Sequence, residues 1–313
     1  MPIVVTGAAG FIGSHVCRAL LKRGDAVVGV DKGISGSPLK AARLATLTGY
    51  PGWRFVEGDV ARLETCESLS ADHGAVEAII HLAAQPGVRR SLERPIETVT
   101  ENVVGSVAVF DAARRSPRPP RIVYASSSSV YGDDSPSPLS ETQATYRPTS
   151  LYALTKRIDE IVADHYADAW RIDATGLRFF TVYGPWGRPD MAPWLFASAI
   201  LDRRPLRVFN NGEHERDFTY IDDVVAGVLA AIDRTLEPIA AGLPHRIYNI
   251  GSGSRVPLMH FIGELERIIG SKAVLEFAPM QFMISGRATT PPIESPFPMP
   301  FANVMMSGVM PWA

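Results

Sequence analysis

The sequence predicts an α/β fold, a doubly wound parallel sheet with helices on both faces and a smaller lobe after it. In the first half of the chain, short β-branched runs alternate with longer segments of helical period. This alternation is typical of parallel strands joined by helical crossovers. A glycine-rich turn directly follows the first run, at the edge where such sheets bind ligands.

The 313 residues, 46% hydrophobic and 20% charged, suffice for one large domain with a second lobe or for two small domains. We expect residues 1–180 to form the sheet domain, 181–281 a substrate-binding lobe and 282–313 an irregular tail. Predicted strands lie at Ile3–Val5, Ala26–Val30, Arg54–Val56, Ala78–Leu82, Ile122–Ala125, Ala174–Arg178, Leu206–Phe209 and Ile247–Ile250. Predicted helices lie at Phe11–Lys22, Val99–Arg115, Leu151–Trp170, Asp222–Asp233 and Leu258–Ile269.

Composition excludes several classes of partner. The formal net charge of −2 provides no basic field for nucleic acid or an anionic membrane. Cys17 and Cys66 are too few for a disulfide framework, so we expect both to be reduced core residues. The sequence shows no signal-peptide pattern and no apolar run long enough to span a bilayer, so we expect a cytoplasmic protein. We expect no metal site.

The first turn has the spacing of a dinucleotide-binding motif. Gly7, Gly10 and Gly13 allow a tight turn, close approach to a pyrophosphate and close helix–strand packing. Phe11 and Ile12 open the following helix, whose first amides can bind phosphate. An ordinary glycine-rich turn is the alternative, but the strand–turn–helix context favours a Rossmann-type site.

Acidic residues after the second and third strands indicate which dinucleotide binds. Asp31 would accept hydrogen bonds from a ribose diol and repel a 2′-phosphate, which favours NAD over NADP. Lys32, beside it, is a positive charge that would favour NADP instead. Asp59 and Val60 follow the third strand and are expected at the adenine; a solvated turn acid is the alternative for Asp59.

Tyr152 and Lys156 are the candidate catalytic pair. They lie four residues apart on a predicted helix and therefore share one face. A phenol has a reference pKa of about 10, and a nearby ammonium favours its ionised form. Such a phenolate could act as a base toward a sugar hydroxyl. The same spacing is common in surface pairs, so the hypothesis depends on the surrounding motifs.

A serine run supplies that context. Ser126, Ser127 and Ser128 lie at the carboxyl end of the fifth predicted strand. Hydroxyls there would face the expected cofactor cleft, although serine runs more often form solvated turns. One of them could hydrogen-bond the hydroxyl that is oxidised and help to relay its proton.

Together these motifs resemble the extended short-chain dehydrogenase/reductases, the NAD-dependent epimerases and dehydratases. The glycine turn, the serine run, the Tyr152–Lys156 pair and Arg216–Val224 occur in the family's order. Within this frame, His81–Arg89 and Arg178–Met191 look like the UDP-glucuronate 4-epimerases. The resemblance runs from about Ile3 to Gln281. From Phe282 the family's usual continuation is absent, as though the reading frame had changed; a divergent native tail is the alternative.

The resemblance implies residue roles. Tyr152 would be the base, Ser127 its hydroxyl partner and Lys156 also a ligand of the nicotinamide ribose. Further cofactor contacts are implied at Leu82, Ala83, Ala84, Asn102 and Ser126. Further substrate contacts are implied at Arg89, Ser128, Val208, Phe209 and Arg216, the last at the UDP phosphates.

The implied reaction is 4-epimerisation of a UDP-sugar by two hydride transfers through a 4-keto intermediate. Related dehydratases and decarboxylases carry acidic residues where this chain has Ser128 and Ser129, which disfavours elimination. Thr181 and Arg188 are expected to hold a substrate carboxylate, which favours UDP-glucuronate; a solvated loop arginine is the alternative for Arg188.

Two other functions stay open at this point. One is a UDP-glucose 4-epimerase or a dual-specificity epimerase, and the other is an NAD-binding sensor protein without turnover. By resemblance, the chain is expected to form a homodimer through the helices Val99–Arg115 and Leu151–Trp170.

Overall fold

The computed structural model describes residues 1–73, 75–132, 135–233, 245–279 and 287–288. Its centre is a seven-stranded sheet, counted over these residues, in the order β11-β6-β5-β4-β1-β2-β3, with every neighbouring pair parallel. The strands of this sheet are β1 (Ile3–Thr6), β2 (Val27–Asp31), β3 (Trp53–Glu57), β4 (Ala78–His81), β5 (Arg121–Ser127), β6 (Ala174–Phe179) and β11 (His245–Ile250).

The strand order reverses direction at β1. Ile3 pairs with Val27 of β2 on one side and with Ala78 of β4 on the other. The loops after β1 and β4 therefore diverge at the carboxyl edge of the sheet. Open α/β sheets bind ligands in the crevice at such a point.

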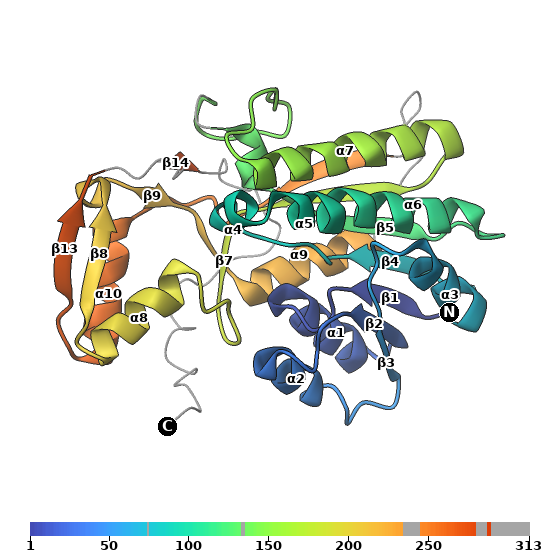
Figure 1. Cartoon of the computed structure of the whole chain (residues 1–313), viewed down its shortest axis with the longest axis horizontal. Helices are drawn as coiled ribbons and strands as arrows, with labels where there is room; N and C mark the ends of the chain where they lie inside the picture. Colours follow the sequence, from blue (N-terminus) through green and yellow to red (C-terminus); the bar gives the residue numbers. More distant parts are fainter. Residues whose placement is uncertain (74, 133–134, 234–244, 280–286, 289–313) are drawn as a thin grey trace.

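Helices cover both faces of this sheet (Figure 1). Apolar side chains of α3, α6 and α7 pack on one face and those of α1, α2 and α9 on the other. The helices of the large lobe are α1 (Phe11–Arg23), α2 (Pro38–Ala45), α3 (Leu63–His73), α4 (Val88–Glu93), α5 (Pro95–Val99), α6 (Gly105–Arg115), α7 (Leu151–Trp170) and α9 (Ile221–Asp233), with the short helical turns η1 (Thr100–Val104) and η2 (Ser128–Tyr131). Strands buried on both faces explain why the sequence reads as continuous apolar runs.

The smaller lobe lies at the opposite end of the molecule from the N-terminus (Figure 1). Its core is a small cluster formed by Ala199, Leu206, Val208 and Ile262. Its elements are α8 (Ala192–Leu201), β8 (Pro205–Phe209), η3 (Asn210–Gly212), α10 (Leu258–Ile269) and β13 (Val274–Ala278). Short pairings connect the two lobes: β7 (Thr181–Tyr183) with β10 (Phe218–Tyr220), and β9 (Glu215–Arg216) with β12 (Val256–Pro257) and β14 (Arg287–Ala288).

The structure confirms the α/β class and most predicted elements, two of them to the residue: α7 and α10. The helix predicted at Val99–Arg115 is longer than expected, because α5 precedes it and η1 is a π-helical turn. Two elements assigned to the smaller lobe, α9 and β11, belong with the large one. β11 extends the main sheet beside β6, and α9 packs against α1, pairings that periodicity alone cannot reveal.

The tail predicted as irregular, 282–313, lies outside the described residues except for the two of β14. Apart from the placement of α9 and β11, the division at residues 180 and 281 stays a prediction. No helix in the described ranges is long and apolar enough to cross a bilayer.

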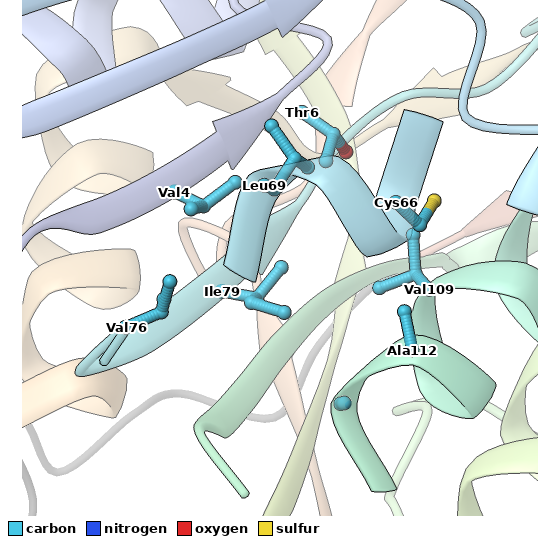
Figure 2. Close-up of a pocket in the computed structure, with 9 residues that line it drawn as sticks. Val4, Thr6, Cys66, Leu69, Val76, Ile79, Val109 and Ala112 are labelled. Atoms are coloured by element: carbon cyan, nitrogen blue, oxygen red, sulfur yellow. The ribbon is translucent and has the colours of Figure 1, made fainter. Parts of the chain in front are cut away.

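A small cavity lies inside the large lobe (Figure 2). Its wall is apolar apart from Thr6 and includes Val4, Cys66, Ile79 and Val109. The volume is about 10 Å³, room for at most one water molecule. This cavity is too small to hold a nucleotide or a sugar.

Candidate active site

The glycine turn between β1 and α1 has no room for side chains at Gly7, Gly10 and Gly13. A Cβ on Gly7 would lie 2.7 Å from the amide nitrogen of Ala83, and φ of Gly7 is +70°. A Cβ on Gly13 would collide with the carbonyl oxygen of Gly7. Gly10 caps α1 without a side-chain hydrogen bond, so the first amides of the helix face the turn as donors. This is the geometry that binds a pyrophosphate.

Asp31, at the end of β2, is held beside this turn. Its carboxylate accepts hydrogen bonds from the amides of Ala9 (2.9 Å) and Lys32 (2.8 Å). Lys40 of α2 donates to the same carboxylate at 2.7 Å, a partner that sequence reasoning missed because it lies in the next helix. The carboxylate is thus fixed beside the glycine turn, and its contact with a ribose diol stays a prediction.

Lys32 does not carry an unbalanced charge toward the cofactor cleft. Its ammonium lies 2.9 Å from Asp59 and 3.0 Å from Glu101. Burial alone would raise the pKa of Asp59, but hydrogen bonds from Lys32 and Ala61 outweigh it and hold the pKa below its usual range. Because both acids pair with Lys32, its charge is not free to attract a 2′-phosphate. Val60 is buried in the core beside Asp59.

Asn102 fixes the loop that follows β4, which includes the predicted cofactor contacts Leu82, Ala83 and Ala84. Its side chain accepts from the amide of Gln85 (2.7 Å) and donates to Gln85 O (3.2 Å) and Thr155 Oγ1 (2.9 Å). Asn102 is fully buried in the π-helical turn η1. Its contact with the nicotinamide stays a prediction; the observed bonds connect the loop to α7.

The serines at the end of β5 have different environments. Ser127 caps η2, and its hydroxyl oxygen accepts from the amide (3.3 Å) and the hydroxyl (2.9 Å) of Ser129. Ser126 is buried and donates to Glu160 at 2.7 Å. A side-chain contact between Ser126 and the cofactor is therefore not supported, and only its backbone could make the predicted contact. Ser128 is half-buried in η2.

Helix α7 carries Tyr152 in its first turn, because Ser150 caps the helix through a 3.1 Å hydrogen bond to the amide of Ala153. Tyr152 is half-buried, whereas Lys156 is 3% exposed. Burial opposes the charge on Lys156, but Asp159 and Tyr152 outweigh it and raise the pKa of the ammonium. Lys156 thus carries a positive charge on the face of α7 that includes Tyr152.

A buried ion pair braces α7 against the serine strand. Glu160 accepts from Arg178 of β6 in bidentate form, at 2.8 and 2.9 Å, and also from Ser126. Both side chains of the ion pair are almost inaccessible. Sequence reasoning missed this cluster. It connects β5, β6 and α7, and it therefore fixes the end of the strand that carries Ser127 relative to the helix that carries Tyr152.

The predicted carboxylate-binding residues lie in β7 and in the loop that follows it. Thr181 begins β7, and its amide donates to Asp217 O at 3.1 Å. The guanidinium of Arg188 lies beside Gly87 and is held in bidentate form by Asp190, with Nε 3.0 Å from Oδ1. A carboxylate does bind Arg188, but it belongs to the protein.

Arg43 connects this loop to the cofactor turn. From α2 it donates to the carbonyls of Ala9 (3.2 Å) and Trp186 (2.6 Å). Burial lowers the pKa of Arg43 to about 10, and Arg188 contributes to the lowering. Trp186 has φ of 62°, a left-handed conformation that needs such support. Sequence reasoning had no signal for this bridge.

The remaining predicted substrate residues are more dispersed. Val208 is completely buried in the small-lobe cluster, so its side chain cannot contact a ligand, which corrects that expectation for the side chain. Phe209 is half-buried beneath the guanidinium of Arg207. Arg216 lies on β9, half-buried, and donates to Glu215 O. Arg89 is exposed on α4, next to the loop after β4.

The chain is similar to known proteins in sequence. Residues 3–251 match the model of the NAD dependent epimerase/dehydratase family. UDP-glucuronate 4-epimerase 4 of Arabidopsis thaliana is 42% identical over 286 residues, covering 87% of this chain; the chain spans 64% of that relative's length.

Two solved structures are similar in fold. UDP-glucuronic acid 4-epimerase from Bacillus cereus, in complex with UDP-glucuronic acid and NAD, has a TM-score of 0.82 and 35% identity, covering 94% of this chain and 90% of that one. UDP-glucose 4-epimerase from Thermotoga maritima, with UDP-glucose, has a TM-score of 0.80 and 28% identity, covering 93% and 89%. The chain belongs to the NAD-dependent epimerase/dehydratase family.

Proposed function

We propose that this protein is an NAD-dependent UDP-sugar 4-epimerase that interconverts UDP-glucuronate and UDP-galacturonate. The observation that carries the proposal is the placement of Tyr152 and charged Lys156 on α7, which packs on the strand that ends at Ser127. The Arabidopsis thaliana relative and the Bacillus cereus enzyme are UDP-glucuronate 4-epimerases by name.

The residues of the glycine turn fit an adenine dinucleotide. Gly7 and Gly13 lie too close to neighbouring backbone to carry side chains, no side chain caps the first amides of α1, and Asp31 is held beside the turn. These groups would hold the phosphates and the adenosine ribose, with Asp59 at the adenine. When bound, NAD supplies the hydride acceptor and donor.

The chain's own residues manage the proton. Tyr152, as phenolate, accepts the proton of the sugar 4-hydroxyl, and Ser127 hydrogen-bonds the same oxygen. Lys156 favours the phenolate through its charge and offers further N–H donors to the ribose. After the 4-keto sugar turns over in the site, Tyr152 returns the proton to the new 4-hydroxyl, and no external redox partner is consumed.

Elimination is disfavoured at this site. Ser128 and Ser129 begin η2, directly after Ser127. A serine hydroxyl cannot replace a carboxyl group as an acid or base at neutral pH. The intermediate should therefore keep its substituents long enough to be reduced again.

The carboxylate of the substrate is assigned to Thr181 and Arg188. Asp190 already binds Arg188 in bidentate form, so Arg188 can hold a carboxylate. The carboxylate of the substrate would have to displace that of Asp190. Fixing the carboxylate would suppress loss of carbon dioxide from the β-keto acid intermediate. Loss of that control would appear as a pentose nucleotide.

The test is product analysis with the purified protein. We expect UDP-galacturonate from UDP-glucuronate and little conversion of UDP-glucose. Conversion of UDP-glucose alone would instead favour the hexose epimerase that the Thermotoga maritima likeness allows. Bound NAD without turnover of either sugar would favour a sensor protein.

A homodimer is part of the proposal. Apolar side chains are exposed on neighbouring helices, and they are Ile96, Val104, Val107, Leu154 and Ile161. Because α6 packs beside α7, two copies could bury these residues in one helical interface. Sedimentation at several concentrations tests this state. A cytoplasmic location stays a prediction from the sequence.

A further inference from the structure

Lys156 has a buried counterion that the epimerase mechanism does not require. Its Nζ lies 3.0 Å from Oδ2 of Asp159, one helical turn further along α7, and the side chains are 4% and 1% exposed. Glu160, next in sequence, is bound by Arg157 and Arg178. Asp159 therefore balances the charge of Lys156.

Polar groups extend from Asp159 to the cofactor turn. The Ser106 hydroxyl favours the ionised form of the Asp159 carboxyl. Ser106 Oγ lies 3.2 Å from His81 Nε2, and His81 Nδ1 lies 2.8 Å from Thr6 Oγ1. Thr6 also accepts from the amide of Ala83 at 3.2 Å. The pair is thus anchored to the strand ends that carry the glycine turn and the loop after β4.

The carboxylate changes the charge of the catalytic cluster. With Tyr152 protonated, the ammonium and the carboxylate sum to zero. Without the carboxylate, the same cluster would carry a net positive charge in a dry environment. Loss of one proton would then relieve an uncompensated buried charge, so it would occur at lower pH.

Other charged groups around the pair do not titrate in its place. On α7 and β6, Glu160 is neutralised by Arg178. From β4, His81 is neutral, because burial and Lys156 lower its pKa to about 3. From β5, burial raises the pKa of Tyr124 well above its usual value. Burial also raises the pKa of Asp159 itself, although Lys156 opposes this.

We propose that Asp159 is a positioning residue that holds the ammonium of Lys156 and sets the pH at which the Tyr152–Lys156 pair loses its first proton. The inference rests on the proposed function for the roles of Tyr152 and Lys156. Its test requires no sugar, so it can fail independently of the substrate assignment.

The experiment is a pH titration of phenolate absorbance in the NAD-loaded protein, with the matching Tyr152→Phe protein subtracted. In Asp159→Asn we expect the midpoint of the Tyr152 signal to fall by about one pH unit or more, the size of shift that a neighbouring charge produces. Asp168→Asn is the matched control, because it makes the same change at an exposed position of α7 and should leave the midpoint unchanged.

Two further variants separate charge from folding. Asp159→Glu keeps the carboxylate and should return the midpoint toward the parent value. Ser106→Ala removes a hydroxyl that favours the ionised form of Asp159 but keeps the carboxyl group. The midpoint of the Tyr152 signal should therefore shift less than in Asp159→Asn, and in the same direction. This variant replaces Asp159→Asn in the test if Asp159→Asn does not fold. An unchanged or higher midpoint in Asp159→Asn that melts cooperatively and binds NAD would overturn the proposal. So would equal midpoints in Asp159→Glu and Asp159→Asn.

Discussion

The two lobes of the molecule differ in how firmly they hold their functional residues. In the large lobe β1, β2 and β4 are buried at every position, and the polar side chains beneath the sheet edge form buried clusters. In the small lobe β13 has no buried residue, and α8 buries three of its ten. We therefore assign cofactor binding and proton transfer to the densely packed large lobe, and sugar recognition to the sparsely packed small lobe.

This difference has a physical reason. Proton and hydride transfer require groups held to within a fraction of an ångström, which a dense, satisfied network provides. Sugar recognition requires entry, rotation and release of the substrate, and sparsely packed elements open more readily. The comparison predicts that substitutions in the large lobe affect rate and stability, whereas those in the small lobe affect affinity.

The largest expected effect is that of Tyr152→Phe. The variant lacks the proton acceptor, so epimerisation should slow by roughly a hundredfold to ten-thousandfold, while NAD binding is retained. Chromatography of UDP-glucuronate and its 4-epimer gives the rate. An unaltered rate would assign the base to another residue.

Stability should depend unequally on ion pairs of the two lobes. Glu160→Gln leaves Arg178 buried without its counterion, which should lower the free energy of unfolding by about 3–5 kcal/mol. Glu264→Gln, in the exposed pair with Arg267 on α10, should cause no measurable change. Urea denaturation of both variants checks this, and equal losses would contradict the contrast between the lobes.

Arg188→Ala should act on affinity. Losing a charged hydrogen-bond donor should raise KM for UDP-glucuronate about 10- to 100-fold, with a small effect on UDP-glucose. The control is Arg204→Ala, an exposed arginine paired with Asp202 in the same lobe. If both sugars lost affinity equally, Arg188 would not be the carboxylate ligand.

The smallest expected effect is on acid stability. The pKa of His81 is about 3 in the folded protein and about 6.5 when unfolded, so the unfolded chain binds more protons between these values. Stability should therefore fall as pH drops below about 6.5, by about 2 kcal/mol from this group at pH 5. His81→Gln should flatten that slope, whereas His260→Gln, exposed on α10, should not.

Local patterns in the sequence predicted most of the framework. The parallel strands follow from apolar runs between turn residues, and α7 follows from its helical period. Tyr152, Lys156 and Ser127 are candidate site residues because they lie in motifs with fixed spacing.

What the sequence did not reveal depends on pairing between distant segments. The bond from Lys40 to Asp31, the bridge from Arg43 to Trp186 and the return of β11 to the main sheet have no local signature. Asp159 lies in the predicted helix as one acid among several, and only the packing of α7 shows that its carboxylate meets Lys156.

In the proposed cycle, the hydrogen taken from C4 of the sugar returns to the same carbon in the same site. This is tested most directly by incubating the purified protein with UDP-glucuronate deuterated at C4 in unlabelled water. We expect UDP-galacturonate that retains deuterium at C4. Loss of the label to water, or a pentose nucleotide as the main product, would contradict it.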